Sequence, residues 1–450
     1  MEHLSEDDLL AAAFEMSAIP EQRRGAVKEH LSACSKCRRT VDFLSVAEDD
    51  LRDPEVWEAV IGSPAADALA DFVARIEEED RQAETLLRPL LASAGTTAWT
   101  DITKSRRFRT GGVARRLTAH AHTVCEQRPL DALTFAEASI TIAELLPDDS
   151  YPGNAVYEIR GTAWKESANA QLLLGRLPQA HESLNRAERA YKHLLSASLG
   201  LASVALVRAS VYYCQQNLAA AAQMAELAEH AFAHLGDDER RATALSLRAS
   251  IKYEARDLEG ASSMFRQVIE YAEASNDAAS MARGLYALAS CEILRGDLND
   301  ASMHLHHALT LLREGGPARD RISAEWALAR VLLQSGKFVD AVRRLDRTIA
   351  DFEALGMLTD AALATLHKAE ALLALGEMRS IAPLMSRTFR TFADAGMLTG
   401  ALSAIAYVKE AAATGALTVG DLEVVYTFLR RVERKPDLLF VPPGTNRNSS

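Results

Sequence analysis

The chain has 450 residues and a formal net charge of −12, with 50 Lys and Arg residues against 62 Asp and Glu residues. Hydrophobic residues make up 48% of it but aromatic residues only 6%, because the apolar content is mostly Ala and Leu, which favour helices over strands. This composition excludes an all-β fold, global disorder and a membrane-embedded bundle, and the acidic balance argues against a direct nucleic-acid partner. The opening residues MEHLSEDDLL lack the basic start and apolar core of a secretion signal, so we expect a cytoplasmic protein.

Potential metal ligands stand near the N-terminus. His30 is followed four and seven residues later by Cys34 and Cys37. Pro20 favours the start of a helix that would end near His30, and the two cysteines would then begin the next helix. A C-x-x-C pair brings two thiolates to one tetrahedral ion, so the spacing predicts a Zn²⁺ site. A closed site needs a fourth ligand, and the only histidine upstream is His3.

The stretch from His3 to about Val46 resembles the zinc-binding anti-sigma domain of bacteria. That family has three short helices and an upstream Cys or His followed by H-x3-C-x2-C. The resemblance implies that residues 1–48 hold zinc through His3, His30, Cys34 and Cys37 and bind a sigma factor or a similar transcription regulator. Two other interpretations stay open: the cysteines are surface thiols without a metal, or the zinc site responds to oxidation.

A connector is predicted over residues 49–112. Residues 55–95 have the periodicity of a helix, and six basic side chains follow between Lys104 and Arg116, with Gly111 and Gly112 among them. We interpret this basic run as a solvated linker. The alternative is a site for an acidic partner or nucleic acid.

A repeated pattern fills the middle of the chain. After each polar turn comes a large apolar residue, and the intervals between these residues are 41, 40, 40, 40 and 40. The residues are Leu177, Leu218, Leu258, Leu298, Phe338 and Met378. A small residue stands nine positions before each of them, namely Ala168, Ala209, Ala249, Ala289, Ala329 and Ala369. Three positions after them stand Ala180, Ala221, Ala261, Ala301, Ala341 and Ile381. The pattern predicts helical hairpins that touch at small residues and stack into a solenoid.

These hairpins resemble tetratricopeptide repeats (TPRs). In the first clear unit the matching places are held by Trp164, Ala168, Leu177, Ala180, Leu184 and Ala187. The period is longer than the family's usual length of about 34 residues. We therefore predict an all-α fold: a three-helix zinc-binding head, then a TPR-like solenoid over residues 113–435 with clear repeats over about 155–395. A degenerate hairpin is expected at 113–147, a capping hairpin at 399–433 and a disordered tail at 436–450.

The resemblance to TPR proteins also implies a groove lined by the first helix of each hairpin. The residues that it places there are Lys165, Asn169, Tyr213, Tyr253, Tyr286, Trp326 and Arg330. Aromatic side chains interspersed with polar groups suit a peptide or protein segment. For Tyr213 and Tyr253, packing between neighbouring hairpins is an equally good interpretation.

The sequence contains no phosphate-binding loop, dinucleotide-binding loop, HExxH motif or G-x-S-x-G motif. We therefore expect a regulator that is not an enzyme, whose head binds a sigma factor or similar protein and whose repeats bind a second protein or peptide. One alternative is a general TPR scaffold whose zinc head is only structural. The other is a peptide-responsive TPR signalling protein, including one that acts on other signalling proteins.

Overall fold

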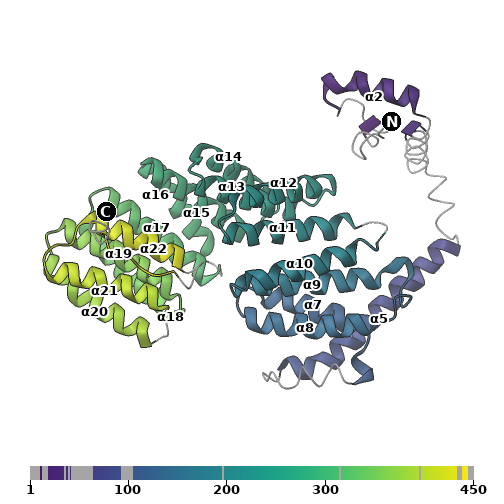
Figure 1. The fold of residues 1–450 in the computed structure, drawn as a ribbon, viewed down its shortest axis with the longest axis horizontal. Coiled ribbons are helices and arrows are strands. Elements are labelled where there is room, and N and C mark those ends of the chain that lie inside the picture. The colour runs from purple at the N-terminus through teal and green to yellow at the C-terminus, as the bar shows by residue number, and fades with distance from the viewer. Residues whose placement is uncertain are drawn as a thin grey trace, which may run out of the picture. The chain divides into compact units, whose positions relative to one another are not determined.

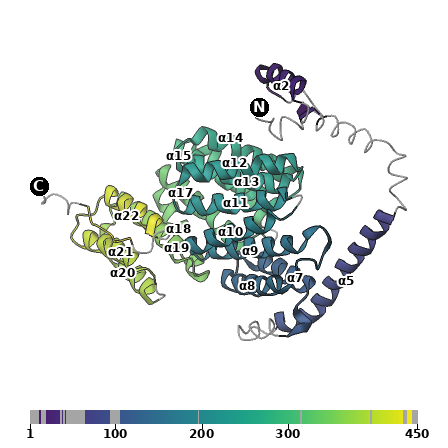
Figure 2. The same ribbon diagram turned by 45° about the vertical axis from the view of Figure 1, so that its right-hand side comes forward.

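The computed structural model describes residues 11–12, 19–34, 37–38, 41, 64–92, 105–194, 197–313, 316–394, 397–432 and 438–443. The secondary structure of these residues is helical, with no strand among them, which confirms the all-α prediction. The chain divides into two compact units, Met1–Ser93 and Ala94–Ser450 (Figures 1 and 2). None of the described helices combines the length and the hydropathy needed to cross a membrane.

In the first unit the structure describes helices α2 (Glu21–Ala33) and α5 (Pro64–Ala92). Pro20 stands at the N-cap of α2, as the sequence predicts, and the carboxylate of Glu21 in the first turn complements the helix dipole. At the other end, Arg38 Nε donates to the carbonyl oxygen of Leu31 at 2.9 Å. The rest of the predicted three-helix head lies largely outside the described residues.

The second unit is a series of eight helical hairpins in the described residues, and this confirms the predicted TPR-like solenoid. Two short 3₁₀ helices, Arg106–Phe108 and Pro152–Asn154, stand beside its first hairpins. The sixteen α-helices are α7 (Gly111–Val124), α8 (Pro129–Leu145), α9 (Val156–Leu173), α10 (Leu177–Tyr191), α11 (Ser198–Cys214), α12 (Leu218–His234), α13 (Asp238–Glu254), α14 (Leu258–Ala274), α15 (Ala278–Arg295), α16 (Leu298–Leu312), α17 (Ala318–Gln334), α18 (Phe338–Ala354), α19 (Leu358–Ala374), α20 (Met378–Asp394), α21 (Thr399–Ala413) and α22 (Val419–Val432).

The repeated small residues lie where the helices touch. All the alanines of both series, and Ile381 at the last place, have an exposed fraction of 0%. The large apolar residue of each repeat is the first residue of an even-numbered helix, from Leu177 in α10 to Met378 in α20, and is partly buried. Because alanine adds so little bulk, the paired helices approach closely and bury the apolar faces that one hairpin alone would expose.

The helices α11 to α20 begin at one constant interval, which is half of the repeat, from Ser198 through Leu218 to Met378. Most of them end in the same turn, in which one residue has a left-handed φ between 55° and 87°. The N–H of the residue after it donates a hydrogen bond to a carbonyl oxygen of the last helical turn; for example, Lys337 N donates to Leu332 O at 2.9 Å. The left-handed residues are Gln216, Gly236, Arg256, Asn276, Gly296, Gly336, Gly356 and Gly376. Each repeat therefore consists of two half-repeats with a common ending.

The interpretation of Gly111 and Gly112 as part of a solvated linker is wrong. Both glycines are buried in the first turn of α7, and Thr110 caps that helix by accepting from Val113 N at 3.3 Å. Gly111 N donates to the Tyr151 hydroxyl at 3.1 Å, and a Cβ at position 111 would lie 2.1 Å from that oxygen. The glycine is required because the tyrosine lies directly against the backbone.

Part of the predicted disordered tail of residues 436–450 is ordered. Residues 438–443 are described, and the ring of Phe440 lies 5.0 Å from that of Phe428 and 5.6 Å from that of Tyr407. Leu438 also packs against the core of the last hairpins. Burial of these apolar side chains offsets the entropy lost on ordering the segment. The prediction of disorder is therefore wrong for this segment, and residues 444–450 lie outside the described part.

Candidate functional site

The first candidate is a metal site at the end of α2. His30 lies in the last turn of the helix, and Cys34 follows as the C-cap residue with its N–H donating to His30 O at 2.7 Å. Cys34 therefore lies one helical turn beyond His30, and Cys37 lies close to both residues. The ligand atoms of the three residues lie within 4.8 Å of one another. The structure thus brings together three of the four predicted ligands, and His3 lies outside the described residues.

The chemistry of these residues fits a metal ion. His30 Nε2 is buried, and no described residue hydrogen-bonds to it. Cys37 is 2% exposed, and Cys34 is half-buried. One imidazole nitrogen and two sulfur atoms are ligands that zinc prefers, and coordination would satisfy the buried nitrogen. The cluster could therefore hold a metal ion, with one position left for a fourth ligand.

The second candidate is a surface formed by consecutive odd-numbered helices. Tyr213 lies on α11, Tyr253 on α13, Tyr286 on α15, and both Trp326 and Arg330 on α17. Since one hairpin makes up one repeat, side chains one repeat apart in the sequence face each other across neighbouring odd-numbered helices. We call the surface formed by these side chains of α11, α13, α15, α17 and α19 the inner surface.

Trp326 fixes the hydrogen-bonding state of a histidine on the next odd-numbered helix. Its indole Nε1 donates to His367 Nδ1 at 3.1 Å, and its ring packs edge-on against Phe352 with centroids 5.8 Å apart. Burial, together with the charge of Arg330, lowers the pKa of His367 to about 3. The imidazole is therefore neutral, and because Nδ1 accepts, its proton is on Nε2.

Several hydrogen-bond donors of the inner surface lack an acceptor. Burial raises the pKa of Tyr253 and of Tyr286, and the positive charge of nearby Arg330 opposes that rise in both. Among the described residues, none accepts a hydrogen bond from the two hydroxyls, from the guanidinium or from His367 Nε2. These groups are half-buried, not sealed off, so a bound molecule could supply the acceptors.

The last helix, α22, lies on the inner surface. Arg430 Nη2 is 2.9 Å from Glu254 Oε1, although 176 positions separate the two residues. Glu254 also accepts a hydrogen bond from the Tyr213 hydroxyl at 3.4 Å. Because α22 packs against α19 (Figure 1) and still reaches α13, the inner surface is curved.

The remaining two predicted groove residues, Lys165 and Asn169, lie on α9. Lys165 Nζ lies 2.5 Å from Glu166 Oε1, and the same carboxylate lies 3.2 Å from His122 Nδ1. Glu166 is 3% exposed. In the described part of the chain no contact joins Lys165 to the cluster around Arg330, so the structure groups five of the seven predicted residues.

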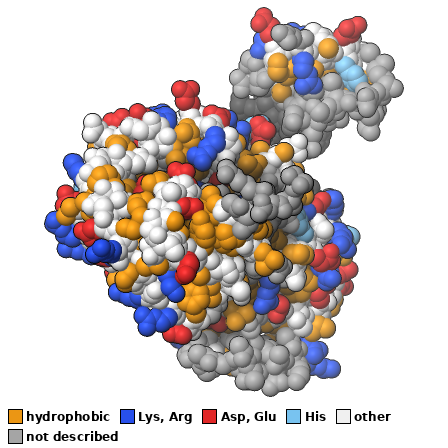
Figure 3. All heavy atoms as spheres, turned by 60° about the vertical axis from the view of Figure 1, so that its left-hand side comes forward, with side chains coloured by type: hydrophobic (Ala, Val, Ile, Leu, Met, Phe, Trp, Pro, Cys, Tyr) orange, Lys and Arg blue, Asp and Glu red, His pale blue; other side chains and the backbone are white. Residues whose placement is uncertain are grey.

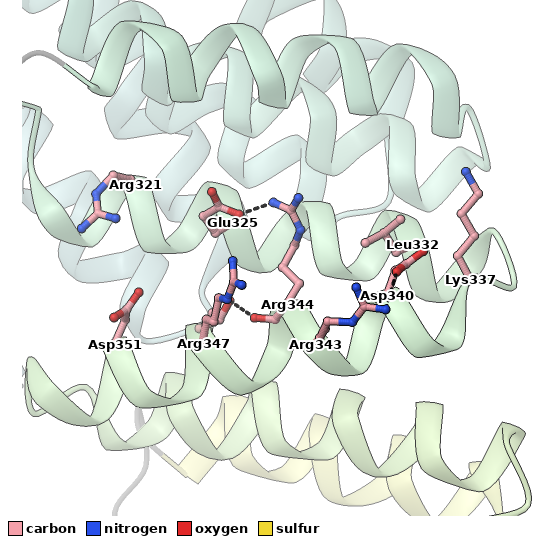
Figure 4. Close-up of a pocket in the computed structure, with 10 residues that line it drawn as sticks. Arg321, Glu325, Leu332, Lys337, Asp340, Arg343, Arg344, Arg347 and Asp351 are labelled. Carbon is pink, nitrogen blue, oxygen red and sulfur yellow. Dashed lines mark hydrogen bonds and ion pairs between the residues drawn. The ribbon is translucent and has the colours of Figure 1, made fainter.

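A separate charged cleft of about 570 Å³ opens between α17 and α18 (Figure 4). Arg344 of α18 pairs with Glu325 of α17, and both point into the cleft. The lining residues are Arg321, Glu325, Leu332, Lys337, Asp340, Arg343, Arg344, Arg347, Thr348 and Asp351. With five cationic side chains against three carboxylates, the cleft favours an anionic group. Elsewhere, on the face drawn in Figure 3, hydrophobic and charged side chains of both signs are interspersed.

The sequence reasoning missed four residues of the inner surface: Glu254, His367, Tyr426 and Arg430. A signal existed for the first two, because Glu254 stands 41 positions after Tyr213 and His367 stands 41 positions after Trp326. A search for polar partners one repeat apart would have found both. For the two residues of α22 no such signal existed, since the period does not specify on which side the last helix packs.

No protein-family profile matches the sequence, and no curated protein is detectably similar to it. Similar solved structures include a STAND signal-transduction ATPase with a tetratricopeptide-repeat sensor from Pyrococcus horikoshii, at 13% identity and a TM-score of 0.50. That alignment covers 74% of this chain and 54% of the ATPase. The apo form of RapI matches at 14% identity and a TM-score of 0.48, over 61% of this chain and 98% of RapI. A Rap protein complexed with competence and sporulation factor matches at 14% identity and a TM-score of 0.45, over 71% of this chain and the whole of that protein. At these identities the likeness concerns the fold alone.

Proposed function

We propose that the chain is a regulatory protein, not an enzyme, and that its inner surface binds a peptide or a segment of another protein. The observation that carries the proposal is the group of half-buried donors around Arg330, from Tyr253, Tyr286 and His367, for which no described residue supplies an acceptor. A polypeptide supplies the acceptors that these donors need, as backbone carbonyls and carboxylates. The neighbouring aromatic rings provide the apolar contact that commonly dominates binding energy at interfaces.

This proposal favours a peptide-responsive protein over a general scaffold. A half-buried donor is hydrated in the free protein, and a ligand acceptor that replaces this water contributes about 0.5–1.5 kcal/mol per hydrogen bond. Binding should therefore depend strongly on the polar groups of the ligand. A scaffold that merely packs two proteins together would not need such a set of donors.

Selection of peptides from a random displayed library against the full chain tests this function. Selected peptides should bind the Arg330→Gln and Tyr253→Ala variants about tenfold or more weakly, which corresponds to about 1.4 kcal/mol. The control is Arg387→Gln, since Arg387 lies on α20, outside the inner surface and the charged cleft, with its side chain 70% exposed. Equal binding to all four proteins, or no selected peptide at all, would refute the proposal.

For the N-terminal unit we propose a zinc ion held by His30, Cys34 and Cys37, with His3 as the fourth ligand, and docking of that unit onto a sigma factor or a similar regulator. The support is the arrangement of one imidazole and two thiols together with the orphaned His30 Nε2. Zinc in such a site stabilises the fold of a small domain that has little core of its own.

Metal analysis of the purified full chain tests the zinc site. One equivalent of zinc is expected in the wild type, and Cys37→Ser and His3→Ala should each lower it, whereas Cys125→Ser, a buried cysteine outside the cluster, should not. Full occupancy in Cys37→Ser would overturn the ligand assignment. Co-purification with sigma factors then tests the partner, and binding that survives zinc removal would contradict docking through this unit.

A further inference from the structure

Helix α22 packs differently from every other even-numbered helix of the described solenoid. The others pack against their own odd-numbered partner and against the next odd-numbered helix. Only α22 also packs comparably against the odd-numbered helix of the preceding hairpin, which is α19. It thereby occupies part of the inner surface, where a bound segment of another protein would have to lie.

The contacts of α22 resemble those of a helix bound in a groove. Leu422, Val425, Leu429 and Val432 are each at most 3% exposed and form its buried face. Tyr426 lies with its ring centroid 5.0 Å from that of His367. One turn later, Arg430 reaches Glu254 on α13. The helix therefore contributes an apolar stripe, an aromatic ring and, four residues after it, a guanidinium.

The two ends of α22 are held in different ways. At its start, Asp421 accepts from Thr418 N at 2.9 Å and from the Tyr407 hydroxyl of α21 at 2.6 Å. The preceding turn contains Gly415 with φ 74°, which allows a sharp reversal there. At the far end, an ion pair joins Arg430 to Glu254, and the two side chains are 40% and 19% exposed. Loss of that pair would weaken the attachment of the far end, which the buried Leu429 and Val432 also hold, while the start stays attached to α21.

One contact of α22 with the inner surface is repulsive, because it brings two carboxylates together. Burial, and then the negative charge of Glu423 on α22, raises the pKa of Glu370 on α19, while Arg330 opposes the rise. Like charges close together disfavour the seated position of the helix, and departure of α22 relieves them. A partner helix with a neutral residue at the corresponding place would avoid this repulsion.

We propose that α22 is a built-in occupant of the inner surface, and that the partner taken by this surface is an amphipathic helical segment with an aromatic residue and, four positions later, an arginine. This inference rests on the proposed binding function. The partner's ring replaces Tyr426 against His367, and its guanidinium replaces Arg430 at Glu254. Because the partner helix makes contacts equivalent to those of α22, replacing α22 by the partner loses little binding energy. Arg430 of α22 must first separate from Glu254.

A labelled peptide with the sequence of residues 417–432 is the probe, and its binding to the full chain is followed by fluorescence anisotropy. Arg430→Glu in the protein removes the Arg430 contact from Glu254, so the peptide should bind this variant about tenfold or more tightly than it binds the wild type. Arg431→Glu is the matched control, since it makes the same change on the exposed face of α22. Hydrogen exchange should be faster in α22 of Arg430→Glu than in the wild type, and unchanged in α21.

A swap of the two charges between the protein and the peptide is the most specific test. Glu254→Arg should not bind the wild-type peptide but should bind a peptide in which Arg430→Glu has been introduced. Equal binding of both peptides to both proteins, or no binding to a variant whose α22 exchanges faster, would overturn the inference. If library peptides still bind Arg330→Gln more weakly than the wild type, the proposed binding function would stand even though the inference about α22 had failed. Dimerisation of Arg430→Glu on gel filtration would also overturn it, by making a second copy of the chain the occupant.

Discussion

Gly336 tests whether the left-handed turn determines the repeat. Its φ is 75°, and a Cβ added there would meet no atom within 4 Å, so Gly336→Ala changes the backbone preference without creating a clash. The left-handed conformation costs a residue with a Cβ about 1–2 kcal/mol. Alanine also reduces the conformational entropy of the unfolded chain, which stabilises the fold by about 0.4–1 kcal/mol. The expected net effect is a loss of about 1 kcal/mol of unfolding free energy.

Urea unfolding followed by circular dichroism measures this loss, provided that the slope against urea concentration is the same in both proteins. The reciprocal change is Arg256→Gly, since Arg256 holds the same place in another turn with φ 67° and an exposed side chain. It should stabilise the chain by a comparable amount. The reasoning is refuted if Gly336→Ala leaves the midpoint unchanged, or if both variants move it in the same direction.

Two further predictions concern packing and pH. Phe352→Ala should lower the unfolding free energy by about 3–5 kcal/mol, because Phe352 is 0% exposed, whereas Val339→Ala at a 57% exposed place on the same helix should change it by about 0.5 kcal/mol at most in urea titrations. The hydrogen bond and the charge of Glu166 raise the pKa of His122 above 6.5. Burial alone would raise the pKa of Glu166, but the hydrogen bond from His122 and the charge of Lys165 help to lower it below 4.5. The pair's stabilisation is then complete between about pH 4.5 and 6.5 and declines as the pH rises through the raised pKa of His122 or falls through the lowered pKa of Glu166. Urea midpoints across this range should show the largest loss for His122→Ala inside the window, and a loss independent of pH would contradict the assignment.

The hairpin architecture could be predicted because packing constrains the alanine positions tightly. A larger side chain at Ala249 or Ala289 would separate two helices that touch there, so small residues recur at these places and reveal the period. The division of each repeat into two similar halves is not evident in the residue types. The turns that end these helices share a backbone conformation, and although glycine holds five of the eight left-handed places, Gln216, Arg256 and Asn276 adopt it too. A pattern defined by φ is therefore partly hidden in the sequence.

The inner surface could be predicted less completely, for a physical reason. Inward positions on odd-numbered helices follow from the repeat, and this located Tyr253, Tyr286, Trp326 and Arg330. Which of them meet depends on side-chain conformations and on the curvature of the stack, which no single repeat specifies. The place of α22 is specific to the last hairpin of the described residues, where α22 packs against α19 as well as α21.

The separation of these two sets of positions allows the solenoid to change its ligand without losing its fold. Contacts between helices fall on the fully buried alanines, whereas the inner side chains Tyr253, Tyr286 and Arg330 are only half-buried. Since the rings of Tyr253 and Tyr286 also pack against the core, only substitutions that keep the ring, such as Tyr253→Phe, alter hydrogen bonding with little effect on the core. The ion pair of Arg430 with Glu254 is the exception, because it joins the last hairpin to α13 across the inner surface. A change at Glu254 should therefore affect both ligand binding and the curvature of the array, whereas Tyr286→Phe, which removes only the hydroxyl, should affect binding alone.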